Sequence, residues 1–156
     1  MPSTLLIGFG NVLRGDDGIG VRIAERLEED DLGAGVRSVA AHQLLPEHVE
    51  WLREVDRVVF VDAAVDVPAG ELIVSELATA SSGGSALQTP GVGPLTFHHL
   101  TPQGLLAACD ALYGRAPDAV MVRIGVASTE TSMALSADLE HRFGEYCERV
   151  RGLLSP

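Results

Sequence analysis

Hydrophobic and polar residues in the first half of the chain alternate between strand-like and helix-like patterns. Thr4 to Gly8 is a short apolar run that stops at a glycine, which predicts a strand. Ile19, Ile23 and Leu27 then recur at helical spacing, which predicts an amphipathic helix. The next expected elements are a weak strand at Val36 to Ala40, a helix at Pro46 to Glu54, and a strand apolar on both faces at Arg57 to Asp62.

The middle of the chain has a different pattern of hydrophobic and polar residues. Gly70 to Leu77 alternates polar and apolar residues, which indicates a hairpin or an edge strand half open to water. Ala78 to Thr96 is rich in Ser, Gly, Thr and Pro and has no period, so we expect a long loop. Thr101 and Pro102 form a helix start, and Gly114 ends this helix. Its inward face is expected to carry Leu105, Leu106, Cys109, Leu112 and Tyr113.

The last two elements complete the alternation of strands and helices. Ala119 to Val126 predicts a strand, and Ser136 to Leu154 predicts a helix. The residues of this helix that we expect to face inward are Leu139, Phe143, Cys147, Val150 and Leu154. Both cysteines, Cys109 and Cys147, are therefore expected to be buried thiols without a disulfide. The order predicts an α/β fold, a single doubly wound domain over residues 1–156 with a mostly parallel sheet and helices on both faces.

Composition and charge narrow the possible partners. The chain has 156 residues, of which 46% are hydrophobic and 21% charged, which suits one packed domain. Its formal net charge of −11 repels phosphate groups, so we expect neither nucleic acid nor a membrane as a partner. No apolar run is long enough to cross a membrane, and Met1 to Thr4 lacks the basic segment of a secretion signal. We therefore expect a cytoplasmic protein.

A glycine-rich loop from Gly8 to Gly18 follows the first predicted strand, where dinucleotide-binding proteins hold phosphate. The spacing does not fit that function, because the third glycine of the fingerprint would fall at Leu13. The charge does not fit either, because Asp16 and Asp17 would face a pyrophosphate at the helix start. The loop is therefore not expected to bind a nucleotide.

Two carboxylates and a histidine form the strongest candidate site. Asp17 and Asp62 each follow a predicted parallel strand, so both are expected at one crevice of the sheet. His98 and His99 precede the next helix. Such a mixed set of oxygen and nitrogen atoms suits a divalent transition metal. Structural roles remain open for each residue: Asp16 or Asp17 can cap the helix, Asp62 can be a turn residue, and the histidines can be solvated.

Three segments of the chain resemble a known family. They are GFGNVLRGDDGIG from Gly8 to Gly20, VFVDA from Val59 to Ala63 and HHLTPQGLL from His98 to Leu106. In this order they resemble the nickel-iron hydrogenase maturation endopeptidases, which remove a C-terminal extension from the hydrogenase large subunit. The resemblance implies a doubly wound α/β fold and the large-subunit precursor as partner. It also implies nickel, carried by the substrate, as the metal recognised, with zinc or cadmium as substitutes.

Position by position, the resemblance places the metal ligands on Asp17, Asp62 and one histidine. Matching the helix start at Thr101 selects His98, whereas counting back from the end of that helix without a gap selects His99. We favour His98, because helix faces are under stronger packing constraints than loop lengths. The expected metal set is therefore Asp17, Asp62 and His98.

The same ligands allow more than one function. Asp17 and Asp62 are the expected catalytic residues of an aspartic-type endopeptidase, in which a carboxylate activates water or the metal polarises the scissile carbonyl. Asp16 is expected to cap the helix start and to orient the loop. A non-cleaving, nickel-sensing chaperone for the large subunit would carry the same ligands. A generic metal-dependent hydrolase of small substrates is a further alternative.

Overall fold

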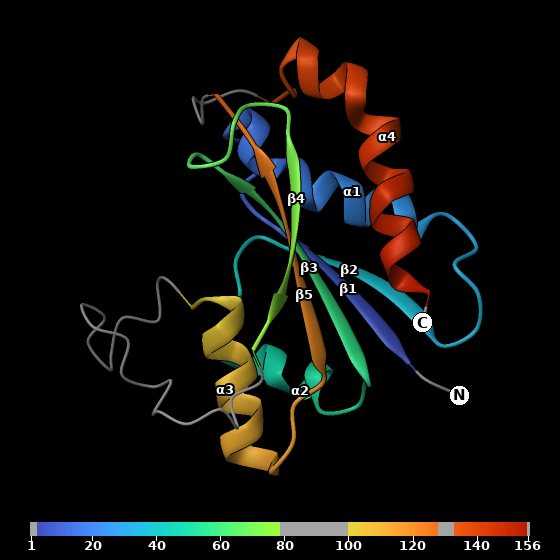
Figure 1. Cartoon of the computed structure of the whole chain (residues 1–156), viewed down its shortest axis with the longest axis vertical. Helices are drawn as coiled ribbons and strands as arrows, with labels where there is room; N and C mark the ends of the chain where they lie inside the picture. Colours follow the sequence, from blue (N-terminus) through green and yellow to red (C-terminus); the bar gives the residue numbers. More distant parts are fainter. Residues whose placement is uncertain (1–2, 79–99, 128–132, 156) are drawn as a thin grey trace.

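The computed structural model describes residues 3–78, 100–127 and 133–155. In this part of the chain a sheet of five strands has the order β2-β1-β3-β5-β4 (Figure 1). Four of its strands are parallel, namely β1 (Thr4–Phe9), β2 (Val36–Ala41), β3 (Arg57–Ala64) and β5 (Asp118–Gly125). Strand β4 (Leu72–Leu77) runs antiparallel to β5 at one edge. The expected edge strand and mostly parallel sheet are confirmed.

Helices cover both faces of the sheet (Figure 1). One face carries α1 (Ile19–Glu28) and α4 (Ala137–Leu154), and the other carries α2 (Val49–Leu52) and α3 (Pro102–Tyr113). Two 3-10 turns, η1 (Gly15–Gly18) and η2 (Pro46–His48), precede α1 and α2. The doubly wound α/β prediction is confirmed, although the helix expected at Pro46 to Glu54 is a 3-10 turn joined to a single short helix.

Alternation along the strands divides the core into two layers. In β1, Leu6 packs against the layer of α1 and α4, whereas Leu5 and Ile7 pack against the layer of α2 and α3. In β3, Val59 and Val61 belong to the first layer and Phe60 to the second. Because side chains alternate between faces, a strand that is apolar throughout is the pattern required of a central parallel strand. All of these side chains are fully buried.

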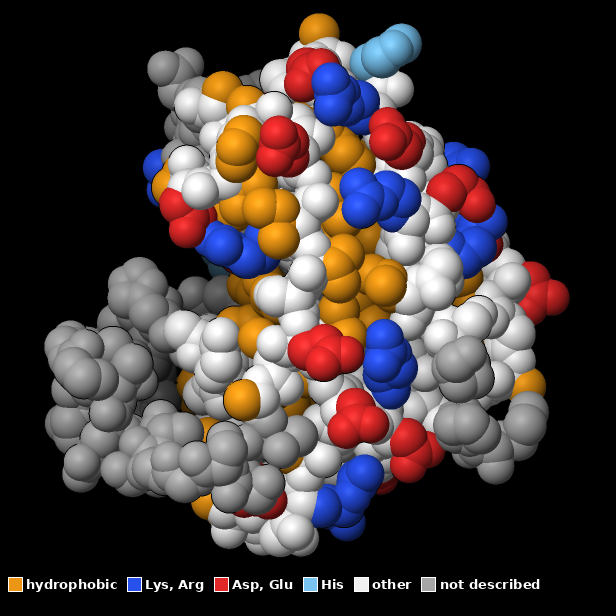
Figure 2. Space-filling view, in the orientation of Figure 1, with side chains coloured by type: hydrophobic (Ala, Val, Ile, Leu, Met, Phe, Trp, Pro, Cys, Tyr) orange, Lys and Arg blue, Asp and Glu red, His pale blue; other side chains and the backbone are white. Residues whose placement is uncertain are grey.

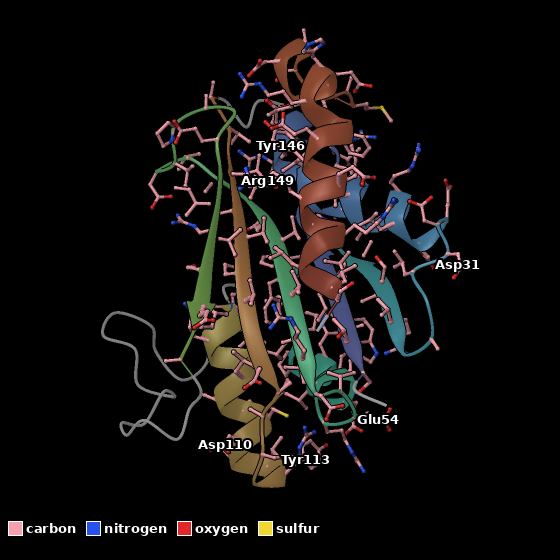
Figure 3. The ribbon with its side chains drawn as sticks, turned by 45° about the vertical axis from the view of Figure 1, so that its right-hand side comes forward. Asp31, Glu54, Asp110, Tyr113, Tyr146 and Arg149 are labelled. Carbon is pink, nitrogen blue, oxygen red and sulfur yellow. The ribbon has the colours of Figure 1, made fainter. Side chains whose placement is uncertain are left out.

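Two expectations about helix faces are corrected. Leu112 is 67% exposed and Tyr113 lies at the end of α3 beside α2, where its hydroxyl bonds to Glu50 and its ring lies under the Arg53 guanidinium (Figure 3). In α4, Tyr146 is buried although the expected inward set omitted it. The Tyr146 hydroxyl donates to the carbonyl of Gly70 at 2.7 Å and so fixes the turn before β4.

The cysteines and the start of α3 agree with the sequence analysis. Cys109 and Cys147 are both buried free thiols, as expected. The helix start is confirmed, because the Thr101 side chain accepts the amide N–H of Gly104 at 3.0 Å. The segment expected to be a long loop, Ala78 to Thr96, lies almost entirely outside the described residues. No helix in the described ranges is long and apolar enough to span a bilayer.

The strand order places a switch point between β1 and β3. From β1 the chain crosses to β2 on one side, and the following strand, β3, lies on the other side of β1. Sheets of this kind bind ligands at the carboxyl ends of the strands beside such a switch point. Helix α1 approaches the sheet very closely here, because a Cβ on Gly20 would lie 2.2 Å from the carbonyl oxygen of Val61.

Candidate metal and catalytic site

The loop that follows β1 brings Asp17 toward β3. Gly10 has a φ of 144°, a value that residues with a side chain rarely adopt. A Cβ at this position would also lie 2.1 Å from the carbonyl oxygen of Asp17. The same Cβ would lie 3.6 Å from Oδ1 of Asp62. Gly10 therefore lies close to both aspartates. A residue with a side chain at this position would separate the two segments that carry them.

The carboxylate of Asp17 is held by the loop itself. Its Oδ2 accepts the amide N–H of Asn11 at 2.9 Å, and the Asn11 side chain accepts the amide N–H of Leu13 at 2.9 Å. The main chain closes the loop further, because the Arg14 N–H donates to the Asn11 carbonyl at 3.0 Å and the Asp17 N–H donates to the Arg14 carbonyl at 3.2 Å. One oxygen of the carboxylate is thus fixed by the main chain.

Asp62 lies within β3, close to its carboxyl end, and its side chain is mostly buried. The pKa of this carboxyl is raised from 3.8 to about 7, chiefly by burial and to a smaller extent by the nearby charge of Asp17. The amide N–H of Ala63, which donates to Oδ1 at 2.8 Å, and the charge of Arg123 act in the opposite direction. A carboxyl with a pKa near neutrality is suited to exchange protons during a reaction. Its ionised form would also gain from a bound cation.

Sequence reasoning missed Arg123, a basic residue beside Asp62. It lies in β5 directly opposite Asp62 in the sheet register, and its guanidinium forms an ion pair with Asp66. The hydrogen bond to Asp66, and to a smaller extent the charge of Asp66, raises the pKa of Arg123. The signal in the sequence was a single charged residue inside the apolar run from Ala119 to Val126. A cation retained in a buried parallel strand indicates a polar site at that end of the strand.

The expectation that Asp16 caps its own helix is wrong. Gly18 is the N-cap residue of α1 and makes no side-chain cap bond, because the 3-10 turn η1 separates Asp16 from that helix. The Asp16 side chain is only 6% exposed, and its Oδ1 accepts the amide N–H of Ser136 at 2.6 Å. Since Ser136 is the N-cap residue of α4, Asp16 provides a hydrogen-bond acceptor for an amide at the start of the last helix. The same bond fixes the loop beside Asp17.

The structure thus brings Asp17 and Asp62 together, as the strand order predicted. His98 and His99 lie outside the described residues, which resume at Leu100. Within the described ranges, no group of three or more His, Cys, Asp or Glu side chains is arranged to hold a metal ion. The structure places the two aspartates near each other, and the metal set of Asp17, Asp62 and His98 stays a prediction.

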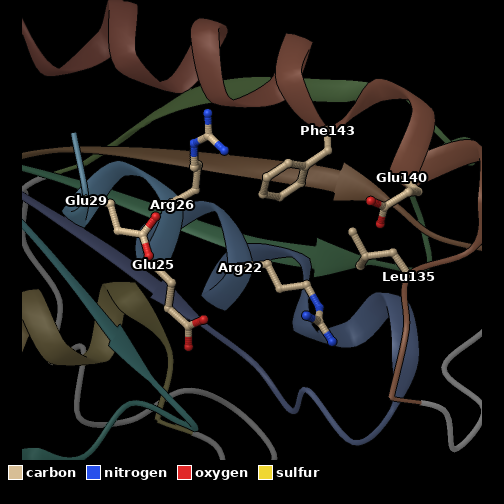
Figure 4. A pocket seen from close by; sticks show the side chains of 7 residues that line it. All are labelled: Arg22, Glu25, Arg26, Glu29, Leu135, Glu140 and Phe143. Carbon is tan, nitrogen blue, oxygen red and sulfur yellow. The ribbon is translucent and has the colours of Figure 1, made fainter.

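A surface pocket lies away from the aspartate pair, between α1 and α4 (Figure 4). Its volume is about 260 Å³. Arg22, Arg26 and Phe143 are among its lining residues, and neither Asp17 nor Asp62 is. Because charged side chains of both signs line this pocket and neither Asp17 nor Asp62 reaches it, the pocket is not the candidate site.

Comparison with known proteins gives a consistent result for the fold. No family model matches the sequence, and no curated protein sequence does either. Solved structures do match over nearly the whole chain. The hydrogenase maturation protease HycI from Thermococcus kodakarensis KOD1 is 27% identical, with a TM-score of 0.70 over 97% of this chain and 92% of that one. This chain has the fold of the hydrogenase maturation proteases, and its sequence resembles theirs.

Two structures from Escherichia coli extend the comparison. The hydrogenase maturating endopeptidase HybD is 22% identical, with a TM-score of 0.73 over 97% of this chain and 91% of that one. An endopeptidase known from its solution structure is 25% identical, with a TM-score of 0.71 over 95% of this chain and 89% of that one. The resemblance to the hydrogenase maturation proteases seen in the sequence therefore extends to the three-dimensional fold.

Proposed function

We propose that this chain is an endopeptidase that removes the C-terminal extension of the nickel-loaded large-subunit precursor of a nickel-iron hydrogenase. In this proposal, Asp17, Asp62 and His98 recognise the nickel ion that the precursor carries. The observation that carries the proposal is that both aspartates lie close to Gly10, at the switch point of a hydrogenase maturation protease fold. The solved structures that share this fold support peptidase activity.

The electrostatics of the aspartate pair support a cation as part of the substrate. Asp62 is mostly buried beside Asp17, and the two causes that most raise its pKa, burial and like charge, would both be offset by a divalent ion. Carboxylate oxygens with one imidazole nitrogen form a donor set that nickel, zinc and similar ions accept. A ligand set of three leaves room for further ligands from the precursor.

Exposed apolar side chains around the pair support a protein substrate. Leu13 follows β1 and is 54% exposed, Val65 follows β3 and is 75% exposed, and Met133 precedes α4 and is 79% exposed. All three lie on connections that follow parallel strands at their carboxyl ends, where Asp17 and Asp62 lie. Apolar side chains grouped around a polar site are typical of protein-binding surfaces. This surface favours a macromolecular substrate over the generic hydrolysis of small molecules.

The chain's own residues suggest how the peptide bond is hydrolysed. An ionised carboxylate takes a proton from the attacking water, and the protonated carboxyl then gives it to the amide nitrogen that leaves. Asp62 suits this role, because a pKa of about 7 makes both forms available at neutral pH. Asp17 is held by the Asn11 N–H and keeps its position while the proton moves. Both aspartates can serve recognition and hydrolysis through different oxygen atoms.

Processing of a nickel-loaded precursor tests the proposal directly. The wild-type chain should shorten the precursor by the mass of its extension, measured by mass spectrometry. Asp17→Asn should abolish processing with little loss of fold. His98→Ala and His99→Ala form a matched pair, of which only His98→Ala should abolish processing. Full processing by Asp17→Asn would remove that residue from the site, and loss in His99→Ala alone would move the third ligand by one position.

A precursor whose mass stays unchanged would favour the second candidate, a non-cleaving, nickel-sensing chaperone. The same aspartate pair could recognise a metal without any hydrolytic role, so the arrangement of Asp17 and Asp62 is compatible with both candidates. Nickel binding should weaken at acid pH in either case, because a protonated carboxyl or an imidazolium cannot bind the ion. Equal nickel affinity at about pH 5 and pH 7.5 would contradict the proposed ligands.

A further inference from the structure

Strand β4 is an edge of the sheet with hydrogen-bonding groups that face outward. The Gly125 N–H donates to the Glu71 carbonyl at 2.8 Å, and paired residues in an antiparallel ladder alternate between bonded and non-bonded pairs. Ile73 therefore bonds toward β5, whereas the main-chain groups of Leu72, Val74 and Glu76 point away from it. No further strand pairs with this edge in the described ranges.

The side chains of β4 leave this edge accessible. Ile73 and Val74, on opposite faces of the strand, are each 40% exposed. The strand LIVSEL contains neither proline nor lysine, the residues that commonly block an edge against pairing. Figure 2 shows hydrophobic side chains along the middle of the face on which Figure 1 places β4. An accessible apolar edge strand of this kind is a template for a further strand.

The sheet register connects this edge to the aspartate pair. Asp62 lies opposite Arg123, and Arg123 lies opposite Ile73 on its other side. These three residues form one row across the sheet, and their side chains emerge on the same face. Two strand spacings of about 4.8 Å separate Asp62 from Ile73. An extended peptide whose scissile bond lies at Asp62 would therefore need about three residues to reach β4.

We propose that the outer edge of β4 binds the C-terminal extension of the precursor as a sixth strand. The inference rests on the proposed function, in which the extension is the part of the precursor that follows the scissile bond and leads away from the nickel. Strand β4 begins at the carboxyl ends of the parallel strands and runs antiparallel to them. An extension that leaves Asp62 and follows β4 would therefore run in the same direction as β4 and pair parallel to it. Main-chain bonds supply recognition of any extended sequence, and Ile73 and Val74 supply apolar contacts.

Val74→Pro tests this pairing with little disturbance of the rest of the sheet. Proline removes the N–H of Val74, which points outward, and keeps the bonds between β4 and β5. Val74→Thr is the matched control, because it keeps the N–H and a β-branched side chain. The thermal unfolding curve of each variant shows whether the fold is retained. Val74→Pro should lower kcat/KM for the full-length precursor at least tenfold, mainly through KM, and Val74→Thr should change it less than threefold.

Amide hydrogen exchange provides a second measurement, made on the wild-type chain without any substitution. Amides of Leu72, Val74 and Glu76 should become protected when the full-length precursor is added, and should not when the precursor is truncated at the cleavage site. Equal kcat/KM in Val74→Pro and wild type, or equal exchange with both precursors, would overturn the strand pairing. Protection that grows with the concentration of this chain alone would also overturn it, in favour of pairing between two copies. Absence of cleavage by the wild type would instead overturn the proposed function.

Discussion

Replacing Asp62 by asparagine should make the protein more stable at neutral and alkaline pH. The pKa of this carboxyl is about 7 in the folded chain, mainly because the side chain is mostly buried, and 3.8 is its ordinary value. The folded state therefore binds more protons than the unfolded state between these two values. Stability falls as the pH rises through this window, because the buried group must ionise. Asparagine stays neutral and still accepts the N–H of Ala63.

The size of the effect follows from the two pKa values. The difference between 3.8 and about 7 corresponds to roughly 4 kcal/mol when the carboxyl is fully ionised. The variant should therefore unfold like the wild type near pH 4 and should be more stable by up to about 4 kcal/mol at pH 8. The same substitution should abolish processing, because it removes a proposed ligand and proton carrier. Stability and activity would change in opposite directions, as is common at functional sites.

Urea unfolding at pH 4.5 and at pH 8, in the presence of a chelator, measures this difference. Comparing the variant with the wild type at each pH cancels the contributions of other titrating groups. Asp118→Asn is a suitable control, because Asp118 is an exposed residue at the other end of the sheet, and its substitution should change stability equally at both pH values. If Asp62→Asn also changes the free energy of unfolding equally at both pH values, the account of Asp62 is refuted.

Three further predictions concern the packing around the site. Asp16→Ala should lower the free energy of unfolding by about 1–3 kcal/mol, measured in urea, because it leaves the N-cap amide of α4 without its partner. Gly20→Ala should reduce soluble expression and the Tm strongly, since its Cβ would lie 2.2 Å from the carbonyl oxygen of Val61; a Tm equal to that of the wild type would contradict this close approach. Leu105→Ala should cost about 2–5 kcal/mol and Leu112→Ala less than about 0.5 kcal/mol, because only Leu105 is buried; equal losses would contradict the observed face of α3.

The strands and the approach of the two aspartates could be predicted from the sequence. Apolar runs such as Arg57 to Asp62 indicate buried parallel strands without further information. Residues that follow such strands meet at one end of the sheet, so the approach of Asp17 to Asp62 follows from strand order alone. The antiparallel edge strand was also predictable, because alternation over Gly70 to Leu77 differs from the continuous apolar runs of the central strands.

Features that depend on distant parts of the chain could not be predicted. The helical pattern of α3 marks Leu112 and Tyr113 as inward, but burial depends on what lies opposite, and polar residues of α2 lie beside Tyr113. The bond between Asp16 and Ser136 joins residues 120 positions apart, and nothing in the local sequence of either indicates it. The ion pair of Arg123 with Asp66 likewise forms only after β3 and β5 have paired.

The bond from Ser136 to Asp16 has a consequence for the order in which the protein matures during translation. The loop beside Asp17 is completed by a residue near the C-terminus, so a ribosome-bound chain that lacks α4 carries an unfinished loop. A chain truncated before Ser136 should therefore leave the buried carboxylate of Asp16 without its amide partner, even if the strands have assembled. The first loop and the last helix should thus reach their final arrangement together.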